Sequence, residues 1–460
     1  MRLNPLLLTD SYKCGHWNQY PPKTQKIYSY FESRGGEHDS TVFFGLQYLL
    51  QEYVKGQFVT SDDLTEANDI CSRHFGGREL LNLDGWQHII NAHGGNLPVR
   101  ICAVPEGTVV PTGNVLMTIE NTDENVPWLT NWLETLLVQA WYPSTVATIS
   151  RAIKKDISYF LSLTGDPDTI ETKLHDFGFR GVSSVESAAL GGVAHLTQFY
   201  GTDTMAALEL ARKHYDCQTA GFSIPATEHS TITSWGKSRE VDAIKNFIDK
   251  NPDGAIACVC DSFDIFSLCR EAIGYKLKPK ILTRNGGFVV RPDSGNPKNV
   301  VLMLLNILES GFGVSTNSKG FKVLHPSIRL IWGDGIDRQG IYSLLEAMMQ
   351  SGWSADNISF GMGGGLLQKL NRDTCKYAFK CSAIKRDNRW EDVYKNPITD
   401  PGKKSKRGRL ALLHDGNEFR TVRSDSEIHP GDCLRTVFLN GEMKHTYKLS
   451  EVRETSAKYR

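Results

Sequence analysis

The chain has 460 residues, too many for one ordinary hydrophobic core, so two or three domains are expected. Its 52 basic and 52 acidic side chains give a formal net charge of zero, which removes any overall charge argument for a nucleic-acid or membrane partner. The apolar stretches are shorter than the roughly 18 residues that a membrane helix needs, and the N-terminus lacks a signal-peptide pattern, so we expect a cytoplasmic protein.

The ten cysteines show no spacing that is typical of a metal or disulfide motif. Cys258 and Cys260 form a CxC pair in the apolar run AIACVC, where a strand would turn their side chains to opposite faces. This distribution indicates reduced, mostly buried thiols rather than a zinc site or a disulfide framework.

The first third of the chain mixes strand and helix patterns. KIYSYFESR (26–34) predicts a strand, and FFGLQYLLQEYVKG (43–56) predicts an amphipathic helix. Residues 97–120 alternate in polarity between Pro and Gly, which predicts an antiparallel β unit. WLTNWLETLLVQAWYP (128–143) has helical spacing and is expected to end at its proline. We expect residues 1–165 to be the N-terminal part of a mixed α+β domain.

Between residues 166 and 372, strand-like runs alternate with helix-like runs. This rhythm predicts parallel strands with helices outside them, which places the chain in the α/β class. Residues 373–460 return to short strand-like pieces, with an Asn-Gly hairpin turn at 440–441. We expect this last segment to pack back on the N-terminal domain, which would then be built from both chain ends.

Three glycine-broken segments each follow a short apolar run: RPDSGNP from Arg291, GDGID from Gly333 and FGMGGGLLQ from Phe360. Glycine lets backbone N–H groups approach phosphate oxygens closely, and a helix N-terminus adds a favourable dipole. Asp293 and Asp334 cannot ligate phosphate, so they are candidates for binding ribose hydroxyls or a metal ion. The combination predicts a phosphorylated-sugar site at the carboxyl ends of parallel strands.

LHDFGFRGVSS (174–184) places His175, Asp176, Phe177 and Arg180 in one turn-like stretch, with two glycines spread among them. Phe177 could stack on a planar ligand, with Arg180 nearby. The alternative is a helix-entry loop that is held by a structural Arg–Asp pair. The residues alone leave both interpretations open.

ATEHSTITSWG (226–236) places Glu228 next to His229, and Asp261 at the end of the following strand could supply a second carboxylate. A carboxylate beside an imidazole raises its basicity and fixes its tautomer. Such a histidine could be a nucleophile or a general base, and a purely structural histidine is the alternative.

Two other segments also have more than one interpretation. YGTDTMAAL (200–208) predicts a helix start that is capped by Thr202 or Asp203. KKSKRGR (403–409) could bind a polyphosphate or nucleic acid, and a solvated charged loop is the plainest alternative.

Taken in order, these segments resemble the nicotinamide phosphoribosyltransferase family over nearly the whole chain. The resemblance is carried by TDSYKCGHWNQYPP, YSYFESR, FFGLQYLL, LTNWLETLLVQAWYPSTVAT, LHDFGFRGVSS, GTDT, PATEHSTITSWGK, RPDSGNP, GDG, GGGLLQKLNRD, FKCS and DPGKKSKRGRL. It implies a homodimeric type II phosphoribosyltransferase with an irregular α/β (TIM-like) barrel in residues 166–372 and active sites shared across the interface. The implied reaction joins nicotinamide to 5-phosphoribosyl-1-pyrophosphate, giving nicotinamide mononucleotide and pyrophosphate in NAD biosynthesis.

The resemblance also implies roles for individual residues. The nicotinamide-binding set is Tyr12 (from the partner subunit), Asp10, Phe177, Arg180 and Asp203. The phosphoribosyl-binding set is Arg291, Asp293, Gly333, Asp334, Gly363 and Gly364, and the pyrophosphate-binding set is Arg34, Arg372, Lys380, Lys395 and Lys403. Mg²⁺ and ATP are the implied cofactors. ATP would phosphorylate His229, with Glu228 and Asp261 in support, and no metal ligands are assigned.

Asp203 distinguishes the two substrates of the wider superfamily. An ionised carboxylate accepts a hydrogen bond from a carboxamide but repels a carboxylate, so nicotinamide is expected over nicotinic acid. Nicotinate phosphoribosyltransferase is the alternative enzyme. A signalling protein or a nucleic-acid binder is the non-enzyme alternative, and the scattered Lys and Arg residues argue against nucleic acid.

Overall fold

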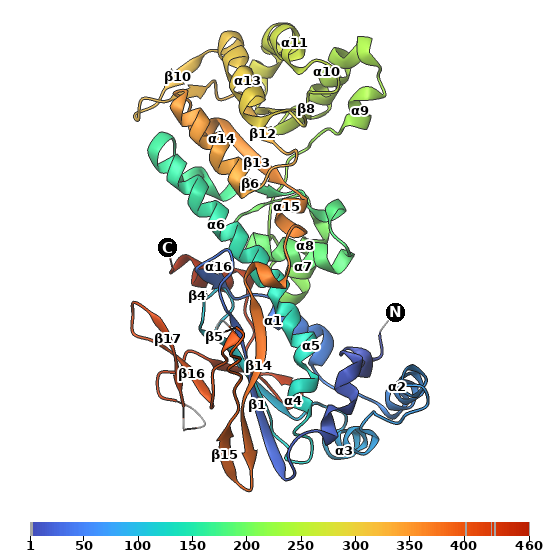
Figure 1. Cartoon of the computed structure of the whole chain (residues 1–460). Coiled ribbons are helices and arrows are strands. Elements are labelled where there is room, and N and C mark those ends of the chain that lie inside the picture. The colour runs from blue at the N-terminus through green and yellow to red at the C-terminus, as the bar shows by residue number, and fades with distance from the viewer. Residues whose placement is uncertain (1–2, 401–402, 425, 427–428, 460) are drawn as a thin grey trace. The chain divides into compact units, whose positions relative to one another are not determined.

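The computed structural model describes residues 3–400, 403–424, 426 and 429–459, which form two compact units (Figure 1). Unit 1 comprises the described residues up to Thr148, those of Lys213–Cys217 and those from Asn371 onward, and unit 2 comprises Ile149–Arg212 and Gln218–Leu370. Within these described ranges, no helix combines the length and apolar content that crossing a bilayer requires.

Unit 1 is built on a seven-stranded antiparallel sheet with the order β15-β14-β1-β5-β3-β18-β19. Its strands are β1 (Thr24–Ser33), β3 (Val99–Ala103), β5 (Val115–Asn121), β14 (Tyr377–Arg386), β15 (Arg389–Asp392), β18 (Arg435–Leu439) and β19 (Glu442–Met443). The central pairing joins the two ends of the chain, with Tyr30 of β1 opposite Lys380 of β14. The predicted strand at 26–34 and the predicted antiparallel unit at 97–120 are confirmed.

Two short strand pairs and several helices complete unit 1. The pairs are β2 (Ser40–Val42) with β4 (Val109–Pro111), and β16 (Leu410–His414) with β17 (Phe419–Arg423). The helices are α1 (Leu46–Leu49), α2 (Ser61–His74), α3 (Leu83–His93), α4 (Leu129–Trp132), α5 (Glu134–Leu137) and α16 (Leu449–Ala457).

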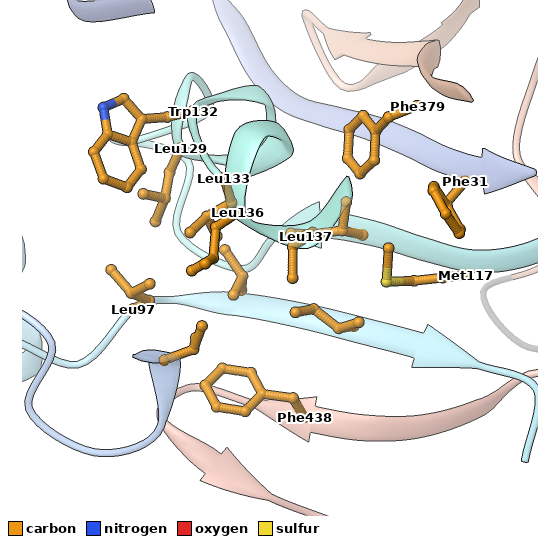
Figure 2. Packing of buried hydrophobic residues seen from close by; sticks show 14 of the residues in the cluster. Phe31, Leu97, Met117, Leu129, Trp132, Leu133, Leu136, Leu137, Phe379 and Phe438 are labelled. Atoms are coloured by element: carbon orange, nitrogen blue, oxygen red, sulfur yellow. The ribbon is translucent and has the colours of Figure 1, made fainter. Parts of the chain in front are cut away.

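The hydrophobic core of unit 1 lies between the sheet and the helical segment 129–140 (Figure 2). Figure 2 shows Leu137 of this segment beside Met117 of β5, with Leu133 and with Phe438 of β18 in the same cluster. All four side chains are at most 1% exposed. Burying a side chain of this size contributes about 1.5–3 kcal/mol, so the cluster holds strands from both chain ends in one sheet.

The helical pattern at 128–143 does not end at Pro143, so that prediction is wrong. The pattern breaks earlier, into α4, α5 and a 3₁₀ turn, and α6 (Trp141–Thr164) then begins just before the proline. A proline in the first helical turn lacks only an N–H group that would have no intrahelical acceptor. Pro143 therefore lies in the first turn of a long helix.

The predicted Asn-Gly turn is confirmed between β18 and β19. Phe438 pairs with Met443 in antiparallel register, and Asn440 and Gly441 both have positive φ angles, 49° and 88°. Two consecutive positive φ angles are what a tight hairpin turn of this type requires, and Asn-Gly adopts them at low cost.

Unit 2 contains a six-stranded parallel sheet with the order β7-β6-β13-β12-β9-β8. Its strands are β6 (Leu174–Asp176), β7 (Gly201–Thr202), β8 (Ile256–Val259), β9 (Phe288–Arg291), β12 (Ile328–Trp332) and β13 (Ile358–Met362). The helices are α7 (Val185–Leu196), α8 (Met205–Tyr215), α9 (His229–Thr233), α10 (Glu240–Lys250), α11 (Ile265–Ser267), α12 (Lys278–Thr283), α13 (Pro297–Phe312), α14 (Arg338–Gln350) and α15 (Gly364–Leu367), and β10 (Val314–Thr316) pairs with β11 (Lys322–Leu324). The predicted parallel α/β arrangement is confirmed.

The parallel sheet curls, and an extended segment lies between its two end strands. Phe222 forms a single parallel bridge to Gly201 of β7, and Ala226 forms another to Ala257 of β8. The six regular strands therefore make a partial barrel, and residues 222–226 connect its two end strands, β7 and β8. A complete TIM-like barrel stays a prediction.

Glu106 is a buried acid in unit 1. Its Oε1 atom accepts a hydrogen bond from the Gln47 backbone N–H at 2.7 Å, and its Oε2 atom accepts one from the Tyr215 hydroxyl at 2.9 Å. Burial is the main cause that raises the pKa of Glu106 to about 7 from its ordinary value of 4.5.

We expect the stability advantage of the native protein over a Glu106→Gln variant to grow as the pH falls from about 7 to 5. Between the ordinary pKa of 4.5 and the raised pKa of about 7, Glu106 is protonated in the folded chain but not in the unfolded chain. Lowering the pH from 7 to 5 therefore stabilises the folded native protein by roughly 2 kcal/mol through the protonation of Glu106. Urea unfolding of both proteins across this range measures the effect. A stability difference that is independent of pH would contradict it.

Candidate active site

A cavity of about 500 Å³ lies at the carboxyl ends of the parallel strands of unit 2. In α/β sheets this is the edge at which ligands bind. The wall is formed by Phe177, Phe179, Arg180, Asp203, Thr204, Glu228, His229, Ser230, Val259, Arg291, Asp293, Gly333, Asp334 and Gly363. The cavity therefore brings together most of the site residues that the sequence indicates in unit 2.

One side of the cavity combines an ion pair, an aromatic ring and a glycine. Arg291 Nη2 lies 3.0 Å from Asp293 Oδ1, and the guanidinium carbon lies 5.4 Å from the centre of the Phe177 ring. A Cβ atom at Gly333 would lie 3.3 Å from Phe177 Cε2 and 3.5 Å from both Arg291 Nε and Asp293 Oδ1. The lack of a side chain at Gly333 keeps this corner open.

The loops after β12 and β13 supply the next part of the wall. The Trp332 indole N–H donates to the Asp334 backbone oxygen at 2.7 Å, which fixes the loop that carries the exposed Asp334 carboxylate. Gly363 precedes α15, and a Cβ atom at Gly364 would meet no atom within 4 Å. Gly364 does not line the cavity itself, but its open backbone allows a ligand oxygen to approach.

Asp203 follows β7, and its carboxylate is exposed. The Ser223 hydroxyl donates to Asp203 Oδ1 at 2.5 Å, while the Thr202 hydroxyl accepts from the Thr204 N–H at 3.0 Å. Because α8 begins only at Met205, the prediction that Thr202 or Asp203 caps this helix is wrong. Asp203 has its carboxylate in the cavity wall instead.

Asp176 holds the backbone beside Phe177 in place. Its Oδ1 atom accepts from the Gly178 N–H at 2.7 Å, and its backbone oxygen accepts from the Asp203 N–H at 2.9 Å. Burial is the main cause that raises the pKa of Asp176 to about 6. The Asp176 carboxyl group therefore stabilises the turn at Phe177, and its backbone oxygen holds the start of the loop at Asp203.

His229 is the first residue of α9. Its Nε2 atom lies 2.9 Å from Asp261 Oδ1, and the Ser294 hydroxyl donates to the other oxygen of Asp261. The Asp261 side chain is 6% exposed and the His229 side chain is 46% exposed, so the buried carboxylate orients an accessible ring. With its Nε2–H donated to Asp261, the imidazole has a lone pair on Nδ1. Glu228 accepts a hydrogen bond from the Ser230 hydroxyl on the same wall.

The remaining predicted residues belong to unit 1. Tyr12 lies on the 3₁₀ segment Ser11–Asn18 and is 62% exposed, and Asp10 accepts a hydrogen bond from the Thr135 hydroxyl at 2.7 Å. Lys403 is exposed and pairs with Asp400, with 3.2 Å between Nζ and Oδ2.

Four of the predicted pyrophosphate-binding residues lie near one another in unit 1. Burial lowers the pKa of Lys380, and the positive charges of Arg34, Arg372 and Lys395 lower it further. The basic segment that follows Lys403 borders a second cavity of about 540 Å³, lined by Tyr394, Asn396, Lys404, Ser405, Lys406 and Arg407. Two parts of unit 1 therefore present concentrated positive charge.

Sequence reasoning missed two kinds of site residue. Thr204 and Ser230 line the cavity directly beside predicted residues, so their positions in the chain were an available signal. Ser223 had no such signal, because it lies 20 residues from the carboxylate that it contacts. Ser294 follows the predicted Asp293 directly, but no local pattern marks its contact with Asp261, 33 residues away.

The chain matches two sequence models of known protein families. The model described as the nicotinate phosphoribosyltransferase (NAPRTase) family matches residues 172–450, and the one described as the nicotinamide phosphoribosyltransferase N-terminal domain matches residues 4–101. Two curated proteins named nicotinamide phosphoribosyltransferase are similar over almost their whole length. The one from Xanthomonas campestris pv. campestris is 51% identical, covering 98% of this chain and 97% of that protein. The one from Acinetobacter baylyi is 32% identical, and the match covers 99% of this chain and 97% of that protein.

Solved structures support the same relationship at the level of the fold. A nicotinate-nucleotide pyrophosphorylase from Pyrococcus furiosus superimposes with a TM-score of 0.61 at 16% identity, covering 99% of this chain and 95% of that one. The human nicotinic acid phosphoribosyltransferase superimposes with a TM-score of 0.57 at 15% identity, covering 98% and 93%. From the family-model matches and the extent of identity, we conclude that the chain is an enzyme that belongs to the nicotinate phosphoribosyltransferase family.

Proposed function

We propose that the protein transfers the phosphoribosyl group of 5-phosphoribosyl-1-pyrophosphate to nicotinamide, giving nicotinamide mononucleotide and pyrophosphate. The observation that carries this proposal is that Asp203 and Phe177 share one cavity with Asp293, Asp334 and the strand-end glycines. The wall thus offers a hydrogen-bond acceptor and an aromatic face for a base, together with carboxylates and open backbone for a sugar phosphate. The curated relatives named nicotinamide phosphoribosyltransferase support the same substrate.

The base would stack on the Phe177 ring, with its carboxamide NH₂ donating to Asp203. The Ser223 hydroxyl occupies one side of Asp203 Oδ1, so the second carboxylate oxygen is the natural acceptor. Arg180, exposed in the same wall, would lie near the ring. This arrangement favours an amide over a carboxylate, because a second negative charge beside Asp203 is repelled.

The phosphoribosyl group would be held by carboxylates and backbone. Asp293 and Asp334 would accept hydrogen bonds from the ribose hydroxyls, while Arg291 and the backbone at Gly333 and Gly363 would bind the 5′-phosphate. These two carboxylates are hard oxygen donors that suit Mg²⁺. When bound, Mg²⁺ would neutralise charge on the pyrophosphate.

The reaction itself needs little acid–base chemistry. The neutral pyridine nitrogen forms the new C–N bond at the anomeric carbon while the C–O bond to pyrophosphate breaks, and the leaving group takes the bonding electrons. Catalysis is then mainly a matter of positioning and charge neutralisation. We assign the leaving pyrophosphate to the basic set Arg34, Arg372, Lys380, Lys395 and Lys403, in a homodimer whose subunits share their sites.

His229 is proposed to couple this reaction to ATP. The Nδ1 lone pair would attack the γ-phosphorus of ATP and ADP would leave, and water would later cleave the phosphohistidine to phosphate. Asp261 would stabilise the imidazolium form through the hydrogen bond at Nε2. Nothing in the base-transfer step requires His229 as a proton acceptor, which leaves it available for this role.

The test is product formation from phosphoribosyl pyrophosphate and Mg²⁺ with either nicotinamide or nicotinic acid, with and without ATP. Mononucleotide formed from nicotinamide and enhanced by ATP would support both assignments. A preference for nicotinic acid would favour the alternative, nicotinate phosphoribosyltransferase, and would remove Asp203 as the discriminating contact.

Replacing Phe177 with alanine should raise the KM for nicotinamide about tenfold or more, because stacking on an aromatic ring contributes roughly 1–3 kcal/mol per base. Tyr12→Ala should have a similar effect if the partner subunit's Tyr12 covers the other face. Steady-state kinetics at saturating phosphoribosyl pyrophosphate measures both.

Mixing the two variants provides the control. Hybrid dimers would contain one site with neither substitution, so mixing should recover part of the activity at low nicotinamide concentration. A mixture that performs no better than the separate variants would contradict a site shared between subunits.

A further inference from the structure

Two histidines and an aspartate that the proposed function does not use converge in unit 1. His88 and His93 belong to α3, and Asp123 follows β5. The Nε2 atom of each histidine lies 2.7 Å from the same oxygen, Asp123 Oδ2. Among the residues that the structure describes, this is the one group of three or more such side chains whose ligand atoms all lie within 4.8 Å of one another.

The convergence is not a by-product of helical spacing. Residues five apart on a helix point about 140° away from each other, so His88 and His93 do not share a face. Both rings nevertheless reach the same oxygen of Asp123. His93 is the last residue of α3, and Gly94 then takes a left-handed conformation with φ 59° and ends the helix. The two rings lie 5.9 Å apart, nearly perpendicular at 77°.

The Asp123 carboxylate is fixed before any ligand binds. Its other oxygen, Oδ1, accepts from the backbone N–H and from the side-chain amide of Asn125, both at 2.9 Å. Its backbone oxygen accepts from the Asn121 amide at 2.7 Å. Asn125 thus directs Oδ2 toward the two imidazoles, which is how outer partners orient the ligands of metal sites.

We propose that His88, His93 and Asp123 bind one divalent transition-metal ion, with Zn²⁺ as the best match. Imidazole nitrogen suits Zn²⁺ and its neighbours and does not suit Mg²⁺ or Ca²⁺, which take oxygen ligands. Two nitrogens and one carboxylate oxygen leave the fourth tetrahedral position to water. The side chains are 34%, 27% and 13% exposed, so an ion can reach them. The ion would join the end of α3 to the loop after β5.

The test uses full-length protein without an affinity tag, stripped with a chelator and titrated with Co²⁺ as a spectroscopic probe. We expect one Co²⁺ per chain, with the visible absorption of a four-coordinate ion, displaced by one equivalent of Zn²⁺. His93→Gln and Asp123→Asn should weaken binding at least 100-fold. Asn125→Ala, which keeps all three ligands, should weaken it about 10–100-fold.

His74→Gln is the matched control, because His74 is an exposed histidine that ends α2 as His93 ends α3. It should leave binding unchanged. His93→Cys tests whether residue 93 acts as a metal ligand or only as a hydrogen-bond partner of Asp123. Because a thiolate binds Zn²⁺ well, this variant should retain stoichiometric Zn²⁺ binding. The proposal is overturned if the native chain binds no stoichiometric metal, or if affinity is the same in folded His93→Gln and Asp123→Asn as in the control.

Discussion

An Asp203→Asn variant is expected to use nicotinamide about 100-fold less efficiently, measured as kcat/KM, and to gain activity on nicotinic acid. A hydrogen bond to a charged group contributes roughly 1.5–3 kcal/mol, and removing the charge also removes the repulsion of a carboxylate substrate. Asparagine keeps an oxygen for the Ser223 hydroxyl, so the loop should be preserved. The experiment compares the kcat/KM values for the two bases at saturating phosphoribosyl pyrophosphate.

Glu209→Gln on α8 is a suitable control, because it removes an exposed carboxylate from the helix that follows Asp203. It should not change the ratio of the two activities. If Asp203→Asn lowers both activities equally, the carboxylate positions the loop rather than recognising the amide.

The second large effect is expected at His229. His229→Ala should reduce ATP hydrolysis at least about 1000-fold while phosphoribosyl transfer without ATP continues, because the covalent phosphoryl acceptor is lost but the cavity wall for base and sugar is kept. Coupled assays for ADP and for nicotinamide mononucleotide follow the two reactions separately.

Asp261→Asn should reduce ATP hydrolysis without abolishing it, because the ring loses its charged partner at Nε2 but keeps its nucleophilic nitrogen. His445→Ala, which removes an exposed histidine of unit 1, should leave both reactions unchanged. ATP hydrolysis that persists in His229→Ala would exclude a phosphohistidine at this position.

The location of the cavity could be predicted from the sequence because the prediction does not require the order of the strands in the sheet. Alternating strands and helices imply a parallel sheet, and all carboxyl ends of a parallel sheet lie at one edge. Any chemistry that follows the strands, such as Asp293 or Asp334, is therefore brought to the same edge. The argument is insensitive to the exact ends of the elements.

What could not be predicted depends on contacts between distant segments. Ser223 reaches Asp203 because residues 222–226 bridge β7 and β8, and no local pattern marks that segment as a neighbour of either strand. The break of the helical pattern before Pro143 was missed for a different, local reason, because the apolar periodicity continues through the short turns. His88 and His93 were overlooked because their spacing does not match one face of a helix.

β6 and β13 are parallel neighbours in the sheet of unit 2 (Figure 1). The contact between Phe177, which follows β6, and the backbone of β13 restricts the motion of the Phe177 ring. A Cβ atom at Gly361 of β13 would lie only 1.9 Å from Phe177 Cε2 and 2.1 Å from Cδ2, so the ring packs directly against the backbone of the neighbouring strand. A ring supported in this way has little rotational freedom to lose when a base arrives. Attempts to enlarge the binding pocket for bulkier bases should therefore leave this rigid surface alone and change the opposite side.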